Sequence, residues 1–353
     1  DECTTALDVT TQLQILDLLK NISKKTNISI LLITHNLAVV SYICSKVYVM
    51  FEGKTIENAE SKKLFLKPQH EYTKKLLNSS KQIENSDFYS NYDTNKILNI
   101  ENLNKTFKLP GTKKPLKAVN NLNFSLNEGE IFGIAGESGS GKTTVANLLM
   151  GLLESNSGKI SFINKEIKSY LKNDRENFRK NIQMVFQDPY GSLNPRKTIG
   201  TTLSLAIKIH FNFDENEIKN KVFELLEKVE LSPPEIFYDR HPHELSGGQQ
   251  QRVAIARAIS TKPKLIISDE AVASLDMSIR SEILKLLKKI NTETKVSMIM
   301  ISHDLSVLKN MCNRIAIMHL GKIVEIGDKN EIFSSPQHDY TKKLISATLE
   351  VPN

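Results

Sequence analysis

The sequence of 353 residues lacks several features that would point to particular protein classes. It has only three cysteines, Cys3, Cys44 and Cys312, and none stands in a C-x-x-C pair or in a zinc-ligand spacing. An odd number of unpatterned cysteines is typical of a reducing cytosol. No apolar run approaches the roughly 20 residues that a membrane-spanning helix needs, so we expect any membrane association to go through partner proteins. The chain begins with Asp1 rather than methionine, which suggests a piece of something longer.

What is present is ordinary in composition. The chain is 40% hydrophobic and 25% charged, as soluble globular proteins are, and its length allows two domains. A net charge of +7 is compatible with an anionic partner such as nucleic acid or a membrane surface. Dispersed Lys and Arg more often serve solubility, and that is the interpretation we favour.

The clearest motif is GESGSGKTT, which fits the phosphate-loop pattern G-x-x-x-x-G-K-[ST]. The apolar run 131–135 predicts a buried strand before it, and residues 145–153 predict a helix after it. Glycines let backbone N–H groups turn around a polyphosphate, and the helix adds the positive end of its dipole. This context argues against a glycine-rich turn that binds nothing, so we predict a nucleotide site. Lys142 is expected to reach the β- and γ-phosphates and Thr143 to ligate Mg²⁺, within a loop of Gly136, Glu137, Ser138, Gly139, Ser140, Gly141, Lys142, Thr143 and Thr144.

The chain also repeats itself. Residues 1–77 align without a gap onto residues 269–345, and about 30 of these 77 positions are identical. DECTTALD matches DEAVASLD, and PQHEYTKKL matches PQHDYTKKL. Chance does not give an ungapped match of this length, so we infer a duplication. The first copy has no phosphate loop: we expect residues 1–79 to be the C-terminal fragment of a first unit, 80–96 a linker, and 97–353 a complete unit.

Periodicity predicts the elements of both copies. The first should hold a helix at 11–24, a buried strand at 28–33, another helix and a hairpin around Gly53. Residues 78–96 lack helical or strand periodicity, which is typical of a linker. The second copy should open with an antiparallel β-subdomain and continue as a parallel α/β core. Its further expected elements are strands at 159–163, 182–186, 264–270 and 296–301, helices at 199–210, 215–231, 278–290 and from Gln249, and a hairpin at Gly321.

Two acidic residues complete the chemistry that hydrolysis of a phosphoanhydride needs. Asp269 ends an apolar run at the place where a metal-binding carboxylate belongs, and Glu270 is placed to polarise the attacking water. The alternative, an acidic strand end that faces solvent, is disfavoured by the apolar run and by the phosphate loop upstream.

LSGGQ at Leu245–Gln249, followed by QQRVAIARA, gives the chain its resemblance to the ATP-binding subunits of ABC transporters, over essentially its whole length. The resemblance implies a phosphate-loop NTPase with a parallel core sheet, an antiparallel β-subdomain and a helical subdomain, preceded by a partial second copy. In that family the signature motif of one subunit caps ATP held by the phosphate loop of the other. A helix N-terminus at this motif is suited to face a γ-phosphate, and Ser246 also suits its N-cap. The implied ATP contacts are Ser246, Gly247, Gly248 and Gln249.

The resemblance assigns further roles. Gln187 in VFQDPYGSLNP matches the Q-loop glutamine, which senses Mg²⁺ and water and leads into the surface that touches the membrane subunits. His303 in MIMISHDL matches the switch histidine that contacts the γ-phosphate, and its place 33 residues after Glu270 is repeated by His35 after Glu2. The implied catalytic set is Glu270, His303 and Gln187, with Mg²⁺ on Thr143, Gln187 and Asp269.

Two contacts lie outside this catalytic set. Asp276 in ASLD matches the D-loop aspartate at the dimer interface. Phe107 in KTFKL is the candidate for the aromatic ring that stacks on adenine, although a core position in the β-subdomain is an equally natural place for it.

QDPYGSLNPR and PQHxYTKKLI resemble the oligopeptide/dipeptide/nickel importer group, in which two ATPase subunits work as a pair and are sometimes fused. The resemblance implies ATP and Mg²⁺ as ligands, two transmembrane permease subunits and a second ATPase as partners, an external solute-binding protein acting indirectly, and no nucleic acid. It places the protein peripherally on the cytoplasmic face of the membrane. Cys3 and Ala273-Ser274 depart from the family pattern without touching the chemistry. Dipeptide, oligopeptide, glutathione-like peptide and nickel stay open as solutes.

Two other interpretations stay open. A soluble ABC protein acting on ribosomes or nucleic acid should carry a long charged helical linker, zinc cysteines or coiled coils, and the sequence shows none of these. The missing front of the first copy also allows an inactive product of a truncated gene. We expect the first copy to be a partly folded appendage, or one packed on the complete unit, because its strand 28–33 lacks neighbours.

Overall fold

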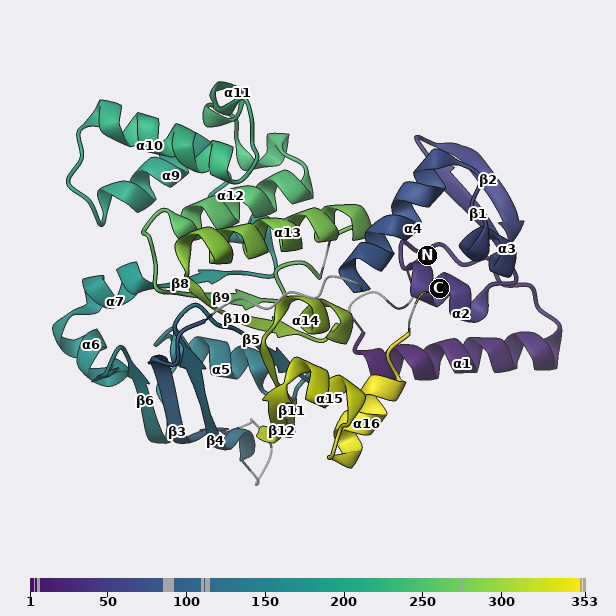
Figure 1. Cartoon of the computed structure of the whole chain (residues 1–353), viewed down its shortest axis with the longest axis horizontal. Helices are drawn as coiled ribbons and strands as arrows, with labels where there is room; N and C mark the ends of the chain where they lie inside the picture. Colours follow the sequence, from purple (N-terminus) through teal and green to yellow (C-terminus); the bar gives the residue numbers. More distant parts are fainter. Residues whose placement is uncertain are drawn as a thin grey trace.

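A computed structural model describes residues 1–2, 4, 7–84, 92–108, 111, 115–273, 275–349 and 351. The departures at Cys3 and Ser274 lie outside these residues. Figure 1 shows a central sheet with helices on both faces, and the N-terminal segment, in purple and blue, beside it. Within the described part of the chain, no helix is both long and apolar enough to cross a membrane.

The core sheet has six strands in the order β12-β11-β5-β10-β9-β8. The five from β11 to β8 are parallel, which confirms the predicted parallel core, and β12 adds an antiparallel edge through its hairpin with β11. Every residue of β5, β9 and β10 is buried, as expected for strands covered on both faces. The strands are β5 (Ile131–Ala135), β8 (Ile182–Val185), β9 (Leu265–Asp269), β10 (Ser297–Ser302), β11 (Arg314–His319) and β12 (Lys322–Asp328).

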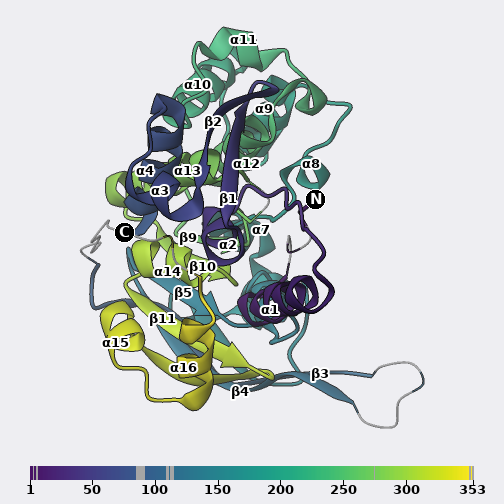
Figure 2. The ribbon, with the colours of Figure 1, turned by 90° about the vertical axis from the view of Figure 1, so that its right-hand side faces the viewer.

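A second, antiparallel sheet has the order β4-β3-β6-β7, which confirms the predicted β-subdomain. Figure 2 shows β3 and β4 running side by side away from the core sheet. The strands of this sheet are β3 (Lys96–Phe107), β4 (Leu116–Asn127), β6 (Ser157–Phe162) and β7 (Lys165–Glu166).

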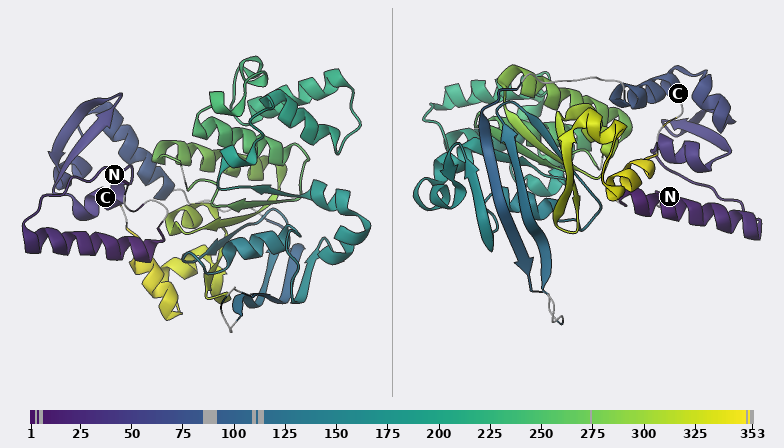
Figure 3. Two further views of the ribbon diagram at one scale, coloured as in Figure 1. Left: turned by 180° about the vertical axis from the view of Figure 1, so that it is seen from behind. Right: turned by 60° about the horizontal axis from the view of Figure 1, so that its bottom comes forward.

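The two faces of the core sheet carry different helices. In β5, Phe132 and Ile134 pack into the cluster that holds α5, while Ile131 and Ala135 pack into the cluster that holds α12, α13 and α14. Figure 3 shows the same arrangement from behind, with α12 and α13 on one side of the strands and α5 on the other. The phosphate-loop helix and the signature helix are therefore separated by the sheet.

Helices fill the rest of this larger body. The helix predicted from Gln249 begins two residues earlier, at Gly247, because Ser246 and Gln249 form a capping box. The helices are α5 (Lys142–Leu149), α6 (Ile167–Asn173), α7 (Arg175–Asn181), α8 (Pro189–Ser192), α9 (Ile199–Lys208), α10 (Glu215–Lys228), α11 (Pro234–Tyr238), η1 (Pro242–Glu244), α12 (Gly247–Ile259), α13 (Met277–Thr294), α14 (Leu305–Met311), α15 (Lys329–Ser334) and α16 (Asp339–Ser346).

The N-terminal segment repeats elements of the C-terminal part with the same bounds in the aligned numbering. Its α1 corresponds to α13, α2 to α14 and α3 to α15. Its hairpin β1–β2 corresponds to β11–β12, down to a register shift at the matching position, after Val49 and after Ile317. The elements are α1 (Val9–Thr26), α2 (Leu37–Ile43), β1 (Lys46–Phe51), β2 (Lys54–Glu60), α3 (Ser61–Leu66) and α4 (Glu71–Glu84).

The predicted buried strand at 28–33 is wrong. These residues form no strand, and Leu31 is 86% exposed, whereas its counterpart Ile299 is 0% exposed within β10. Strand β10 is hydrogen-bonded to β9 on one side and β5 on the other. Helices and a hairpin satisfy their own backbone groups, but a parallel strand needs neighbouring strands, and among the described residues no strand pairs with 28–33.

The first copy packs on the rest of the chain, one of its two expected arrangements. Its small core is built around Val47, Leu64 and Phe65 and includes Val351 from the chain's end. Helix α4 lies against α13 and α14. It continues to Glu84, into the segment where no helix was expected, and residues 85–91 lie outside the described part of the chain.

Candidate functional site

The phosphate loop connects β5 to α5, and its backbone requires glycine. Gly136 has φ +152°, and a Cβ there would lie 2.2 Å from the Met318 carbonyl oxygen. Gly141 has φ +106°, and its Cβ would lie 2.2 Å from the Ala118 carbonyl oxygen. No side chain caps α5 at Gly141, so its first N–H groups are available to an anion.

Lys142 is folded into this loop. Its Nζ atom donates to the carbonyl oxygens of Gly136 at 2.8 Å and Glu137 at 2.9 Å. Burial lowers the pKa of Lys142, and the carboxylates of Glu270 and Asp269 act in the opposite direction. The ammonium is thus held among loop carbonyls and carboxylates, where phosphate oxygens can replace the carbonyls as acceptors.

Asp269 and Thr143 meet beside the loop and suit a divalent cation. Asp269 is buried at the end of β9, and its Oδ1 has no hydrogen-bond partner. Burial raises its pKa, while a hydrogen bond with Thr143 acts in the opposite direction. A buried orphan carboxylate oxygen beside a hydroxyl fits Mg²⁺, which takes one or two carboxylates together with phosphate and water oxygens. No cluster of three or more His, Cys, Asp or Glu able to hold a metal occurs among the described residues, and this mode of binding needs none.

The structure brings the three predicted catalytic residues together. Oε1 of Glu270 lies 3.0 Å from Nδ1 of His303, and its Oε2 accepts from Nε2 of Gln187 at 3.1 Å. The hydrogen bond from His303 is the main cause of the lowered pKa of Glu270. Glu270 also has φ +49°, a left-handed conformation that is uncommon outside glycine and often found at functional sites. The result is an ionised carboxylate held from both sides.

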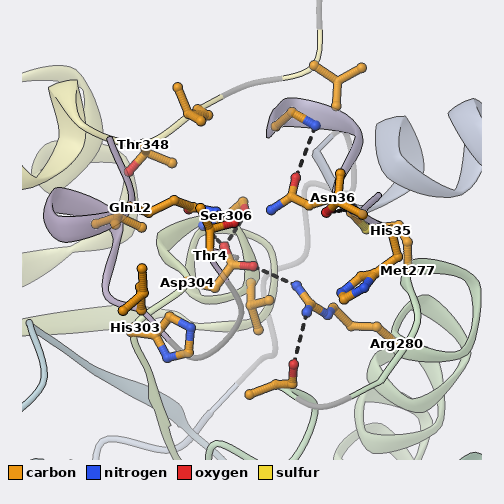
Figure 4. A pocket seen from close by; sticks show the side chains of 18 residues that line it. Thr4, Gln12, His35, Asn36, Met277, Arg280, His303, Asp304, Ser306 and Thr348 are labelled. Carbon is orange, nitrogen blue, oxygen red and sulfur yellow. Dashed lines mark hydrogen bonds and ion pairs between the residues drawn. The ribbon is translucent and has the colours of Figure 1, made fainter. Parts of the chain in front are cut away.

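The first copy contains the same acid–histidine pair. Nδ1 of His35 lies 2.7 Å from Oε1 of Glu2, which has φ +41°. Figure 4 shows His35 and His303 in a pocket of about 120 Å³ between the N-terminal segment and the rest of the chain. The pocket is lined by residues at matching repeat positions: Gln12 and Arg280, His35 and His303, Asn36 and Asp304.

The predicted signature residues lie away from the phosphate loop of this chain. Ser246 caps α12, since its Oγ accepts from the Gln249 N–H at 3.3 Å, and the Gln249 Oε1 accepts from the Ser246 N–H at 3.0 Å. Helix α12 lies across the core sheet from α5. Asp276 stands at the N-cap of α13 without a side-chain capping bond. The structure therefore does not bring signature and loop together.

Phe107 ends β3 opposite Leu116 and is half-buried. Among the described residues, the Phe107 ring is part of neither of the two large hydrophobic clusters on the faces of the core sheet. Nζ of Lys105 lies 5.2 Å from the centroid of this ring. This position does not support the alternative of a core phenylalanine.

Two contacts of the loop were missed at the sequence level. The Glu137 N–H donates to the Tyr340 hydroxyl at 3.3 Å, and the Thr10 hydroxyl donates to the Glu137 carboxylate. Tyr340 stands in the repeated PQHxYTKKL motif, but no spacing links it to a loop 203 residues earlier.

Comparison with known proteins gives matches to two family models. The family model "ABC transporter" matches residues 119–273, and the model "Oligopeptide/dipeptide transporter, C-terminal region" matches 56–105 and 324–353. The glutathione import ATP-binding protein GsiA of Escherichia coli K12 is 38% identical over 376 residues, and that of Shigella flexneri is equally similar. These matches cover 98% of this chain but only 60% of the relatives.

Solved structures are also similar to part of this chain. The cbiO1 protein of Clostridium perfringens, part of the ABC transporter complex cbiONQ, has a TM-score of 0.59 and 31% identity, over 68% of this chain and 92% of that one. A dimeric bacterial ABC transporter cassette has a TM-score of 0.58 and 30% identity, over 66% and 98%. The chain belongs to the family of ABC transporter ATP-binding proteins.

Proposed function

We propose that this chain binds and hydrolyses ATP to power an ABC importer for peptides or a related solute such as glutathione. The observation that carries the proposal is the Glu270 carboxylate, ionised and fixed between His303 and Gln187, beside a phosphate loop that presents Lys142. The similarity to glutathione import ATP-binding proteins and the two matches to the oligopeptide/dipeptide model support the solute class.

The roles follow from the positions of the side chains. The loop backbone and Lys142 bind the polyphosphate of the substrate ATP, and Thr143 and Asp269 would hold Mg²⁺. When bound, Mg²⁺ neutralises charge on the phosphates. The Glu270 carboxylate accepts a hydrogen bond from the attacking water and acts as its general base. His303 keeps that carboxylate ionised and oriented.

A second ATPase unit is part of the proposal. The signature helix α12 and the phosphate-loop helix α5 lie on opposite faces of the sheet, and we infer that the signature and the loop each need a complement from elsewhere. The similarity to dimeric cassettes supports such a pairing. We place two transmembrane permease subunits and, indirectly, an external solute-binding protein in the same assembly, with this chain peripheral on the cytoplasmic face and without a nucleic-acid partner.

We also propose that residues 1–79 are the C-terminal part of a first ATPase unit, 80–96 a linker and 97–353 the second unit. The repeated element bounds support this division. The oligopeptide/dipeptide model matches 324–353 at the end of the second unit and 56–105, which runs from the end of the first unit through the linker into the start of the second.

Titration of the full chain with MgATP tests the nucleotide function. The unaltered chain should bind MgATP saturably. Lys142→Ala should lose binding, because it removes the ammonium that donates to the carbonyls of Gly136 and Glu137 and that phosphate oxygens can take over. Lys24→Ala, a change at an exposed position of α1, is the control for loss of a positive charge. Equal affinity of Lys142→Ala and the unaltered chain would refute a phosphate-loop site.

A further inference from the structure

Tyr340 connects the C-terminal helix α16 to the phosphate loop. Its side chain is largely buried, and its ring stacks on His319 with centroids 3.8 Å apart. Its hydroxyl accepts a hydrogen bond from the backbone N–H of Glu137 at 3.3 Å. This hydrogen bond joins Glu137, the second residue of the loop, to residues 324–353, which match the model of the oligopeptide/dipeptide transporter C-terminal region.

The peptide groups around Glu137 are held from several sides. The Glu137 carbonyl accepts from Nζ of Lys142 at 2.9 Å and from the Ser140 N–H at 3.2 Å. Its carboxylate accepts from the hydroxyl of Thr10 in α1. Its N–H is directed at Tyr340, and this differs from the expectation that the whole loop turns its N–H groups toward phosphate.

The Tyr340 hydroxyl keeps its proton at neutral pH. Burial raises the pKa of Tyr340 to about 12, although the backbone hydrogen bond from Glu137 acts in the opposite direction. A neutral phenol both accepts from an N–H and stays compatible with the nearby Glu137 carboxylate.

We propose that Tyr340 is a positioning residue for the phosphate loop: its hydroxyl fixes the peptide at Glu137 and so makes nucleotide affinity depend on helix α16. The proposal rests on the nucleotide-binding function above. Removing the hydroxyl leaves the Glu137 N–H without its acceptor, so the entry of the loop can rotate away from the conformation that presents the remaining N–H groups.

The repeat supplies a matched control. Tyr72 is the counterpart of Tyr340 in the first copy, in α4, and its ring packs on Phe51 with centroids 4.3 Å apart, as the Tyr340 ring packs on His319. No phosphate loop accompanies it within residues 1–79. Tyr72→Phe therefore removes the same atom from a similar ring without touching a nucleotide site.

The experiment measures MgATP affinity of the full chain by calorimetry for three proteins: unaltered, Tyr340→Phe and Tyr72→Phe. We expect about 3- to 10-fold weaker binding for Tyr340→Phe, the usual effect of losing one hydrogen bond, with no change for Tyr72→Phe. Melting temperatures without nucleotide should agree within a few degrees for all three, because both rings keep their packing and one hydrogen bond is a small part of the stability. A Tyr340→Phe protein whose melting temperature falls strongly together with its affinity would overturn the positioning role, because it would show a general structural defect.

Unchanged affinity in a stable Tyr340→Phe protein would overturn the proposal while leaving the nucleotide function intact, whereas no binding by the unaltered chain would overturn that function. If Tyr340→Phe does not fold, amide exchange of the unaltered chain decides. The Glu137 amide should be protected without nucleotide, and rapid exchange there would contradict the proposed hydrogen bond.

Discussion

Nδ1 of His303 lies 3.0 Å from Oε1 of Glu270, at the edge of the sheet where the phosphate loop also ends. A carboxylate only accepts hydrogen bonds, so Nδ1 carries the proton. The same pair recurs in the first copy as His35 and Glu2, without a phosphate loop. The same acid–histidine geometry therefore occurs both beside a phosphate loop and without one.

The pH dependence of turnover should follow from this pair. His303 lowers the pKa of Glu270, so the base is ionised at neutral pH and is lost only on acidification below its ordinary pKa of 4.5. His303→Ala removes that effect, and the acidic limb of kcat against pH should move to higher pH. His35→Ala should leave the profile in place. An unmoved limb in His303→Ala would show that the contact does not control Glu270.

Asp269→Asn should weaken the dependence of nucleotide binding on Mg²⁺. Its orphan Oδ1 is the oxygen that suits the cation, and an amide is a poorer ligand. We expect MgATP affinity to fall about 10-fold or more while ATP affinity in excess EDTA changes little. Equal loss of affinity with and without Mg²⁺ would instead indicate a damaged loop.

Glycine replacements in the loop should differ in cost. Gly136→Ala places a Cβ 2.2 Å from the Met318 carbonyl and strains a φ of +152°, so we expect about 3 kcal/mol or more of lost stability in urea unfolding. Gly139→Ala meets nothing within 4 Å and carries only the strain of φ +77°, so it should cost about 1 kcal/mol. Equal costs at the two positions would be inconsistent with the close approach at Gly136.

Residues 28–33 should behave as exposed chain. Leu31→Lys should change stability by about 0.5 kcal/mol or less, because Leu31 is 86% exposed. Ile299→Lys, at the matching position, buries a charge in β10 and should be severely destabilising. Hydrogen exchange should be fast for amides 28–33 and slow for 297–302, and comparable protection would mean that the first copy has found partners for its strand.

Local patterns predicted most of the fold and of the site. The motif predicts Ser246 as an N-cap, although its helix begins two residues before the predicted start at Gln249, and the phosphate loop and its acids followed from motif and context. The wrong prediction and the missed contact both depend on parts of the chain that are distant in sequence. The run at 28–33 has strand propensity but no neighbouring strands, and the hydrogen bond between Tyr340 and Glu137 joins residues 203 positions apart. Neither fact is contained in a short window of sequence.

Phosphate release from MgATP by Glu270→Gln tests the central claim most directly. Glutamine keeps the size of the side chain and its amide oxygen can still accept from His303, but it cannot take a proton from water. We expect MgATP affinity within about 3-fold of the unaltered chain and a turnover lower by about 100-fold or more, as for loss of a general base. Turnover of Glu270→Gln equal to that of the unaltered chain would contradict the account.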